Sequence, residues 1–260
     1  MEVVILPGGQ DIAALAADAI VRLLGEKPDA VLGLATGSSP LGVYGELHRR
    51  CGAGEVSFAR ARGFLLDEYV GLPADHPQRY RSVIRHELED SVDFAAGAVT
   101  GPDGTADDIR VACSSYEEMI LAAGGVDLQL LGIGTDGHIG FNEPGSSLAS
   151  RTRIKTLTAQ TRADNARFFA SADEMPRHVL TQGLGTISAA RHLVMLATGS
   201  GKAGAVHRMV EGPVSAACPA SVLQLHPHVS VLLDDAAAAR LALGGYYRET
   251  YAGKPSWQGL

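Results

Sequence analysis

Residues 30–40 read AVLGLATGSSP, and this stretch decides the fold because it joins an apolar run to a polar, glycine-containing turn. The run at 30–35 has no charged side chain, which is typical of a strand covered on both faces. Four small residues follow it: Thr36, Gly37, Ser38 and Ser39. The helix-like segment LGVYGEL comes next. A buried strand followed by a turn and a helix is the repeating unit of an α/β protein with a parallel sheet.

The same alternation continues along the whole chain. Further apolar runs lie at residues 2–6, 63–66, 126–133, 192–197 and 229–233. Helical patterns lie at 10–24, 106–123, 200–210 and 235–247, and Gly25 stands where a C-cap glycine would end the first of them. We therefore predict one α/β domain over residues 1–260. It has three layers, a mainly parallel central sheet with helices on both faces, and is Rossmann-like but without a dinucleotide site.

Composition limits the class of protein. The chain has 260 residues, 46% of them hydrophobic, which is enough for a full core. Its net charge of −7 argues against a nucleic-acid partner. The three cysteines, Cys51, Cys113 and Cys218, are scattered, as expected of reduced thiols in a cytosol. No segment looks like a signal peptide or reaches the roughly 18 apolar residues of a membrane span, so we expect a cytoplasmic protein.

Two polar turns that follow apolar runs can carry chemistry, because ligands of parallel sheets bind beyond the carboxyl ends of the strands. In the turn at 36–40, Ser39 is a candidate N-cap and Pro40 suits the first helical position, so free N–H groups could hold an anion; an ordinary capped turn is the alternative. In the second turn, Asp67 and Glu68 follow the run at 63–66. Neighbouring strand residues point to opposite faces, so one acid can face a site, and Asp67 is the better candidate for a general base. Solvated turn residues are the alternative.

The third turn is GIGTDGHIGFNEP at residues 132–144. It matches GxGxxG, but glycine, Asn142 and Pro144 would break the helix that a dinucleotide site requires. It contains Asp136, His138 and Glu143, and a histidine held between carboxylates can move protons near neutral pH. A metal site is the competing interpretation, and we rank it lower because no other His or Cys lies at ligand spacing nearby.

The segments LATGSSP, LDEYVGLPADHPQRYRSV, GIGTDGHIGFNEPGSSLASRTRIKTL, NARFF, GLGTI and GSGKA together resemble the glucosamine-6-phosphate deaminase family over nearly the whole chain. The related 6-phosphogluconolactonases share the GxDGH segment, but there the histidine leads into a Ser-Leu-Phe-Pro type of sequence. This chain has Phe-Asn-Glu-Pro instead, and Glu143 therefore favours the deaminases.

The resemblance implies an enzyme of N-acetylglucosamine catabolism that needs no cofactor or metal and turns glucosamine 6-phosphate and water into fructose 6-phosphate and ammonia. Asp67 resembles the base that removes the C2 proton, and His138 the group that opens the sugar ring. Asp136 and Glu143 resemble the carboxylates that orient His138. The phosphate is expected at Thr36, Gly37, Ser38, Ser39, Arg167 and Lys202.

The resemblance also suggests regulation and assembly. In allosteric members the positions matching Ser146, Arg153, Lys155 and Thr156 bind the phosphate of N-acetylglucosamine 6-phosphate between subunits of a hexamer. Without the family, Arg151, Arg153 and Lys155 would be read as one solvated face of a strand. The C-terminal TYAGKPSWQGL departs from the family pattern, which puts this regulation in doubt.

Three alternatives stay open at this point. The chain could be a lactonase or another sugar-phosphate isomerase, or a sugar-phosphate-binding protein that has lost catalysis. The sequence also leaves open the choice between glucosamine and galactosamine epimers.

Overall fold

The computed structural model describes residues 1–158, 162, 169, 171, 174–255 and 257–260. Its strands are β1 (Glu2–Leu6), β2 (Val31–Leu34), β3 (Arg62–Leu65), β4 (Asp67–Tyr69), β5 (Val99–Thr100), β6 (Leu128–Gly132), β7 (Arg153–Thr156), β8 (His178–Thr181), β9 (His192–Ala197) and β10 (Val229–Asp234). Its α-helices are α1 (Gly9–Glu26), α2 (Ser38–Gly52), α3 (Tyr80–Glu87), α4 (Ile109–Ala122), α6 (Leu184–Ile187), α7 (Ala203–Val210), α8 (Asp235–Ala238) and α9 (Gly244–Ala252). Its 3₁₀ helices are η1 (Glu89–Ser91), η3 (Ser200–Lys202) and η4 (Pro219–Leu225).

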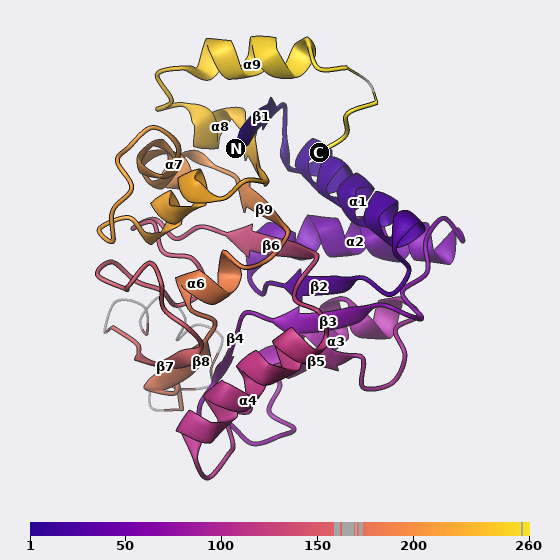
Figure 1. Cartoon of the computed structure of the whole chain (residues 1–260), viewed down its shortest axis with the longest axis vertical. Helices are drawn as coiled ribbons and strands as arrows, with labels where there is room; N and C mark the ends of the chain where they lie inside the picture. Colours follow the sequence, from indigo (N-terminus) through magenta and orange to yellow (C-terminus); the bar gives the residue numbers. More distant parts are fainter. Residues whose placement is uncertain (159–161, 163–168, 170, 172–173, 256) are drawn as a thin grey trace.

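A seven-stranded parallel sheet forms the centre of the molecule, in the order β1-β10-β9-β6-β2-β3-β5 (Figure 1). Every residue of β2 and of β9 is buried, so both faces of the sheet are covered around these strands. This confirms the predicted α/β fold with a mainly parallel sheet. The continuous apolar runs predicted these strands because neither face of a buried parallel strand contacts water.

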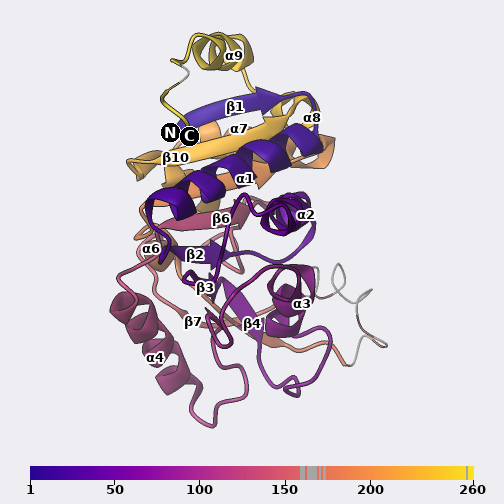
Figure 2. The same cartoon turned by 90° about the vertical axis from the view of Figure 1, so that its right-hand side faces the viewer.

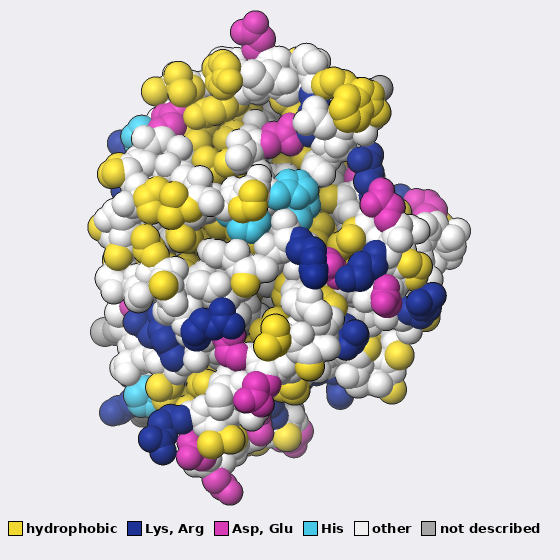
Figure 3. Space-filling model, in the orientation of Figure 1, with side chains coloured by type: hydrophobic (Ala, Val, Ile, Leu, Met, Phe, Trp, Pro, Cys, Tyr) yellow, Lys and Arg dark blue, Asp and Glu magenta, His cyan; other side chains and the backbone are white. Residues whose placement is uncertain are grey.

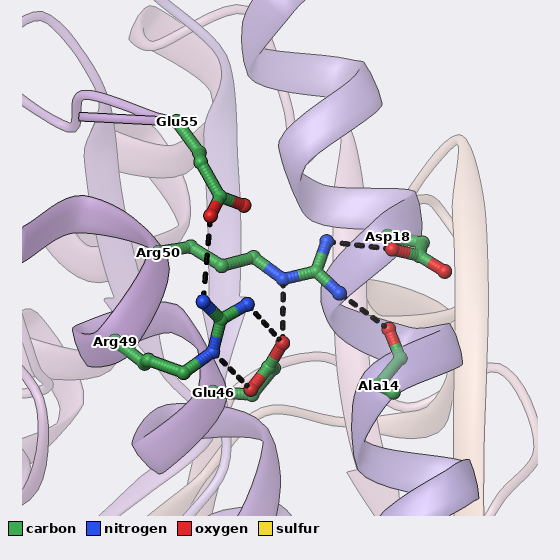
Figure 4. Close-up of polar contacts among 6 residues, drawn as sticks. All are labelled: Ala14, Asp18, Glu46, Arg49, Arg50 and Glu55. Carbon is green, nitrogen blue, oxygen red and sulfur yellow. Dashed lines mark hydrogen bonds and ion pairs between the residues drawn. The ribbon is translucent and has the colours of Figure 1, made fainter. Parts of the chain in front are cut away.

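Helices α1 and α2 pack side by side along the sheet, and α3 follows α2 (Figure 2). Arg50 links the first pair: its guanidinium donates to Glu46 Oε1 at 2.8 Å and to Asp18 Oδ1 at 2.6 Å (Figure 4). Arg49 shares Glu46 but lies on the exposed side. Arg50 is therefore the charged residue that ties α1 to α2, while apolar side chains supply the rest of the contact.

A second sheet, β4-β8-β7, is antiparallel and lies beyond the end of β3 (Figure 1). The chain passes from Leu65 at the end of β3 through Leu66 directly into β4. Asp67 is the first residue of β4 and is paired with Thr181 of β8. The change of sheet therefore places Asp67 at the carboxyl edge of the parallel sheet, where ligands of such folds bind.

Three predicted boundaries are wrong. Helix α1 continues through Gly25 and is capped at Lys27. Helix α2 starts at Ser38 with Gly37 as its N-cap, so Ser39 and Pro40 lie inside the first turn. The closing helix is two helices, α8 and α9, because Asp234 caps a short first helix and the chain turns before Gly244.

No helix among the described residues is long and apolar enough to cross a membrane. Figure 3 shows one face of the molecule, where dark-blue basic and magenta acidic side chains lie next to one another rather than in patches of one sign.

Candidate active site

The loop that follows β6 is folded tightly around His138. The amide of Gly134 donates to the carbonyl of His138 at 3.0 Å. The imidazole lies against Gly134, where an added Cβ would come within 2.2 Å of the ring, so only glycine fits there. Arg208 of α7 donates to the carbonyl of Thr135 at 3.2 Å. Of the glycines of GIGTDG, Gly134 makes room for the histidine, while Gly132 and Gly137 lie against Ser39 and Cys218, so no nucleotide is needed to explain them.

Asp136 holds His138 in two ways. Its Oδ1 accepts a hydrogen bond from the His138 amide at 3.1 Å. The same oxygen lies 2.7 Å from His138 Nδ1, within ion-pair distance, although the angle is outside that of a hydrogen bond. The side chain of His138 is 33% exposed, so its ring can meet a ligand and exchange protons with it.

Asp67 meets the same loop at Gly140. A Cβ on Gly140, whose φ is +56°, would lie 3.4 Å from Asp67 Oδ2 and 3.0 Å from Thr181 Oγ1. Thr181 Oγ1 also accepts a hydrogen bond from the Phe141 amide at 3.2 Å. The loop that carries His138 is therefore fastened beside Asp67 through Thr181.

Burial makes the carboxyl group of Asp67 an unusually weak acid. It is 5% exposed. Burial raises the pKa of Asp67 from 3.8 to about 8, and the negative charge of Glu68 adds to the rise. The free chain therefore holds Asp67 mostly protonated at pH 7. The ionised form, which alone can accept a proton, requires higher pH or a cation beside it, and a carboxylate of raised pKa is the stronger proton acceptor.

The predicted phosphate loop lies next to the loop of His138. Ser39, in the first turn of α2, packs on the end of β6, and a Cβ on Gly132 would lie 3.2 Å from Ser39 Oγ. Thr36, Gly37 and Ser38 are at least partly exposed at the same helix end. Lys202 of η3 is half-buried; burial lowers its pKa and the charge of Asp136 opposes that change, so the two side chains are close enough to interact.

The remaining predicted residues lie as follows. Glu143 is half-buried and accepts a hydrogen bond from Thr158 Oγ1 at 3.5 Å. Arg167 lies outside the described residues. Ser146 is 4% exposed and its amide donates to the carbonyl of Glu143 at 3.0 Å.

The predicted basic strand is only partly confirmed. Arg153 and Lys155 share one face of β7, and Thr156 ends that strand. Arg151 lies before the strand and is paired with Glu117 of α4. Thr156 Oγ1 lies 3.3 Å from His178 Nδ1 on the neighbouring β8.

A cavity of about 790 Å³ lies elsewhere, at the amino edge of the parallel sheet. Its lining includes Leu128 and His192, the first residues of β6 and β9, and none of the predicted site residues. Three of its basic residues are paired within the chain: Arg50 with Asp18, Arg191 with Asp127 and Lys254 with Glu2. Among the described residues no group of three or more His, Cys, Asp or Glu side chains could hold a metal ion.

The sequence did not indicate the contacts of two residues that lie beside Asp67, Thr181 and Glu68. Thr181 belongs to a four-residue strand, HVLT, which carries no motif. Glu68 was taken only as the neighbour of Asp67, yet its fully buried carboxylate binds the start of α3. The adjacency of two acids was a signal, but the contacts of the second depend on tertiary structure.

The sequence model of the family described as glucosamine-6-phosphate isomerases/6-phosphogluconolactonase matches residues 9–232, and the chain belongs to this family. Proteins named glucosamine-6-phosphate deaminase from Beutenbergia cavernae and Mycolicibacterium smegmatis are each 69% identical to it over 261 residues, with 100% of both chains covered.

Solved structures agree with this assignment. One described as a monomeric glucosamine-6-phosphate deaminase is 42% identical, with a TM-score of 0.89, and covers 92% of this chain and 100% of its own. The 6-phosphogluconolactonase from Trypanosoma brucei is 22% identical, with a TM-score of 0.76 over 93% of this chain and 98% of its own. The second comparison shows the shared fold alone.

Because Asp67 is buried, we predict that replacing it by a residue that cannot ionise raises the free energy of unfolding, and that this gain depends on pH. Between pH 3.8 and about 8 the folded chain keeps a proton that the unfolded chain has released, so this group lowers the free energy of unfolding as pH rises. Asp67→Asn should be more stable than the parent, by at least about 1 kcal/mol near pH 8 and by little near pH 4. Urea denaturation at several pH values measures this.

Asp75→Asn is the matched control, because Asp75 is exposed. It should change the free energy of unfolding by less than about 0.5 kcal/mol at every pH. A stability difference for Asp67→Asn that does not vary with pH would contradict the assignment of a raised pKa.

Proposed function

We propose that this chain converts glucosamine 6-phosphate and water into fructose 6-phosphate and ammonia, with Asp67 and His138 as its acid–base groups. The deaminase prediction is confirmed by full-length relatives that carry this name at 69% identity. The observation that supports the residue roles is the meeting of Asp67 with the loop of His138 at Gly140. A lactonase would need a base to activate water, but it would remove no proton from carbon, which is the step assigned here to Asp67.

The proposed reaction combines proton transfers with hydrolysis of an imine. His138 moves a proton from the C1 hydroxyl to the ring oxygen, which opens the ring to an aldehyde. Asp67 then removes the C2 proton, made acidic by that aldehyde, and leaves an enolamine. Protonation at C1 gives a ketimine; water adds at C2 and ammonia leaves. Each positioned proton transfer contributes about 10²–10⁴-fold in rate.

The substrate itself favours the ionised form of Asp67. Its C2 ammonium would lie beside the carboxylate and lower the pKa that burial has raised. The proposed phosphate site is the N-terminus of α2 with Thr36, Gly37, Ser38 and Ser39, and Lys202 adds a positive charge. Arg167 would join them but lies outside the described residues. Asp136 orients His138, and we assign the same role to Glu143.

We further propose a cytoplasmic homo-oligomer of single-domain chains in which Ser146, Arg153, Lys155 and Thr156 bind N-acetylglucosamine 6-phosphate. The three cysteines are unpaired, which suits a reducing compartment. Arg153 and Lys155 share a face of the edge strand β7, while Ile154 on the opposite face is 44% exposed. The relative at 42% identity is described as monomeric, so assembly varies among these proteins.

Replacing Asp67 tests the base. Asp67→Asn should slow exchange of the substrate C2 hydrogen with solvent by at least about 10²-fold, because an amide cannot accept that proton. Phosphate binding should stay within about twofold, since the proposed phosphate loop is separate. Exchange is followed by proton NMR in deuterium oxide, with Asp75→Asn as control. Exchange at the parent rate would remove Asp67 from this role.

Replacing His138 tests ring opening. His138→Gln should reduce turnover of the ring-closed sugar by about 10²-fold or more and turnover of an open-chain analogue far less. The variant keeps hydrogen-bonding capacity but cannot shuttle a proton. Ammonia release from the two substrates measures the difference, and equal losses on both would argue for another function of His138.

The effector proposal predicts a shift in saturation. Added N-acetylglucosamine 6-phosphate should lower the substrate concentration at half-maximal rate by about fivefold or more, within the usual range of allosteric coupling. Lys155→Gln should lose most of this response and keep its unstimulated rate. Inorganic phosphate at equal concentration is the control. A saturation curve that the effector leaves unchanged rules out regulation at β7.

A further inference from the structure

Glu68 is a fully buried carboxylate that accepts several hydrogen bonds. Its Oε1 accepts from the amides of Tyr69 at 2.8 Å and Tyr80 at 3.0 Å, and its Oε2 accepts from the amide of Arg81 at 3.0 Å. The guanidinium of Arg79 lies 3.6 Å from Oε2. Tyr80 and Arg81 are the first residues of α3, so this side chain ties β4 to the start of that helix.

These contacts suit the charged form of Glu68. Both oxygens act as acceptors, and a protonated carboxyl would have to turn one of them into a donor facing an N–H group. Burial raises the pKa of Glu68, whereas the amides and Arg79 oppose the rise. A buried charge needs such partners to be tolerated. The three amides and Arg79 therefore favour a negative charge on Glu68, directly beside the candidate base, against the effect of burial.

Within the described part of the chain, four titratable groups interact with the charge of Asp67. Glu68 follows it in the chain, and the phenols of Tyr69, Tyr80 and Tyr116 interact with it electrostatically. Burial raises the pKa of Tyr69 to about 12, and that of the other two phenols well above their ordinary values. All three phenols are neutral in the working range of pH, so Glu68 supplies the charge within this group.

We propose that Glu68 is a positioning residue for the reaction, which fixes β4, and with it Asp67, against the start of α3 and holds a negative charge directly behind Asp67. The proposal rests on the proposed function, because it assigns Asp67 the removal of the C2 proton. Adjacent residues of a strand point to opposite faces, so Glu68 acts from behind Asp67 and does not touch the substrate.

A purely structural role of Glu68 makes a different prediction. If the side chain only anchors α3, its loss lowers the rate equally at all pH values. If its charge also acts on Asp67, its removal lowers the pKa of Asp67, and the low-pH side of the profile of kcat/KM moves to lower pH. That side reports an essential base of the free enzyme.

The test is Glu68→Gln, with ammonia release measured from pH 5 to 9. We expect kcat to fall about tenfold or more, KM to stay within about threefold, and the low-pH midpoint of kcat/KM to fall by at least about half a unit. Glu89→Gln is the matched control. Glu89 lies just after the C-terminal end of α3, and its carboxylate accepts a hydrogen bond from the side chain of Arg81 at 3.0 Å. Its replacement should leave the low-pH midpoint of kcat/KM unchanged.

A folded Glu68→Gln chain with an unchanged midpoint overturns the proposal, as does an unchanged kcat. If that variant does not fold, ¹³C NMR of the carboxyl groups in the parent chain replaces it. Glu68 must then be ionised at the pH where Asp67 binds its proton, and a protonated Glu68 there overturns the proposal. Failure of the proposed function is a separate result: the parent chain would release no ammonia.

Discussion

The junction between β3 and β4 is the constraint on which the site depends. The carbonyl of Leu65 accepts hydrogen bonds from Tyr116 OH at 2.6 Å and from Gln182 Nε2 at 3.0 Å. The amide of Leu66 donates to Leu34 at 3.1 Å, and its carbonyl accepts from the Gln182 amide at 2.8 Å. Buried backbone groups must be paired, so α4, β2 and the end of β8 together fix where the chain leaves one sheet for the other. The position of Asp67 follows from that crossing.

The same junction lowers the stability of the folded chain, because it buries the carboxyl group of Asp67. A carboxyl placed at this point loses water, gains a charged neighbour in Glu68 and keeps its proton to about pH 8. Proteins tolerate such sites where function requires them, and the surrounding core compensates. Here the compensation is visible in the paired backbone of the junction and in the buried strands on either side of it. The burial that would make Asp67 a strong base in the proposed mechanism is therefore also a local weakness of the fold.

Periodicity predicted the parallel sheet well, because β9 and β10 are continuous apolar runs that match residues 192–197 and 229–233 closely. It missed the antiparallel sheet: the segment of β7 reads as the solvated face of a strand, but nothing in its sequence indicates the strand β8 with which it pairs. The site followed from motifs, which placed Asp67 and His138 on separate loops. Neither motif nor spacing could show that Gly140 and Thr181 join those loops, because that contact depends on how the two sheets meet.

The net charge of −7 is compatible with an anionic substrate because charges act locally in salt solution, over about 8 Å. An amino-sugar phosphate carries an ammonium and a phosphate at opposite ends. The proposed site carries the complementary pair: a buried carboxyl at Asp67, and the N–H groups at the start of α2 together with Lys202 of η3. Lys202 also interacts with Asp136, which holds His138. In the proposed mechanism, phosphate bound at Lys202 would therefore act on His138 through one intervening carboxylate, that of Asp136, and so couple substrate binding to the proposed ring opening.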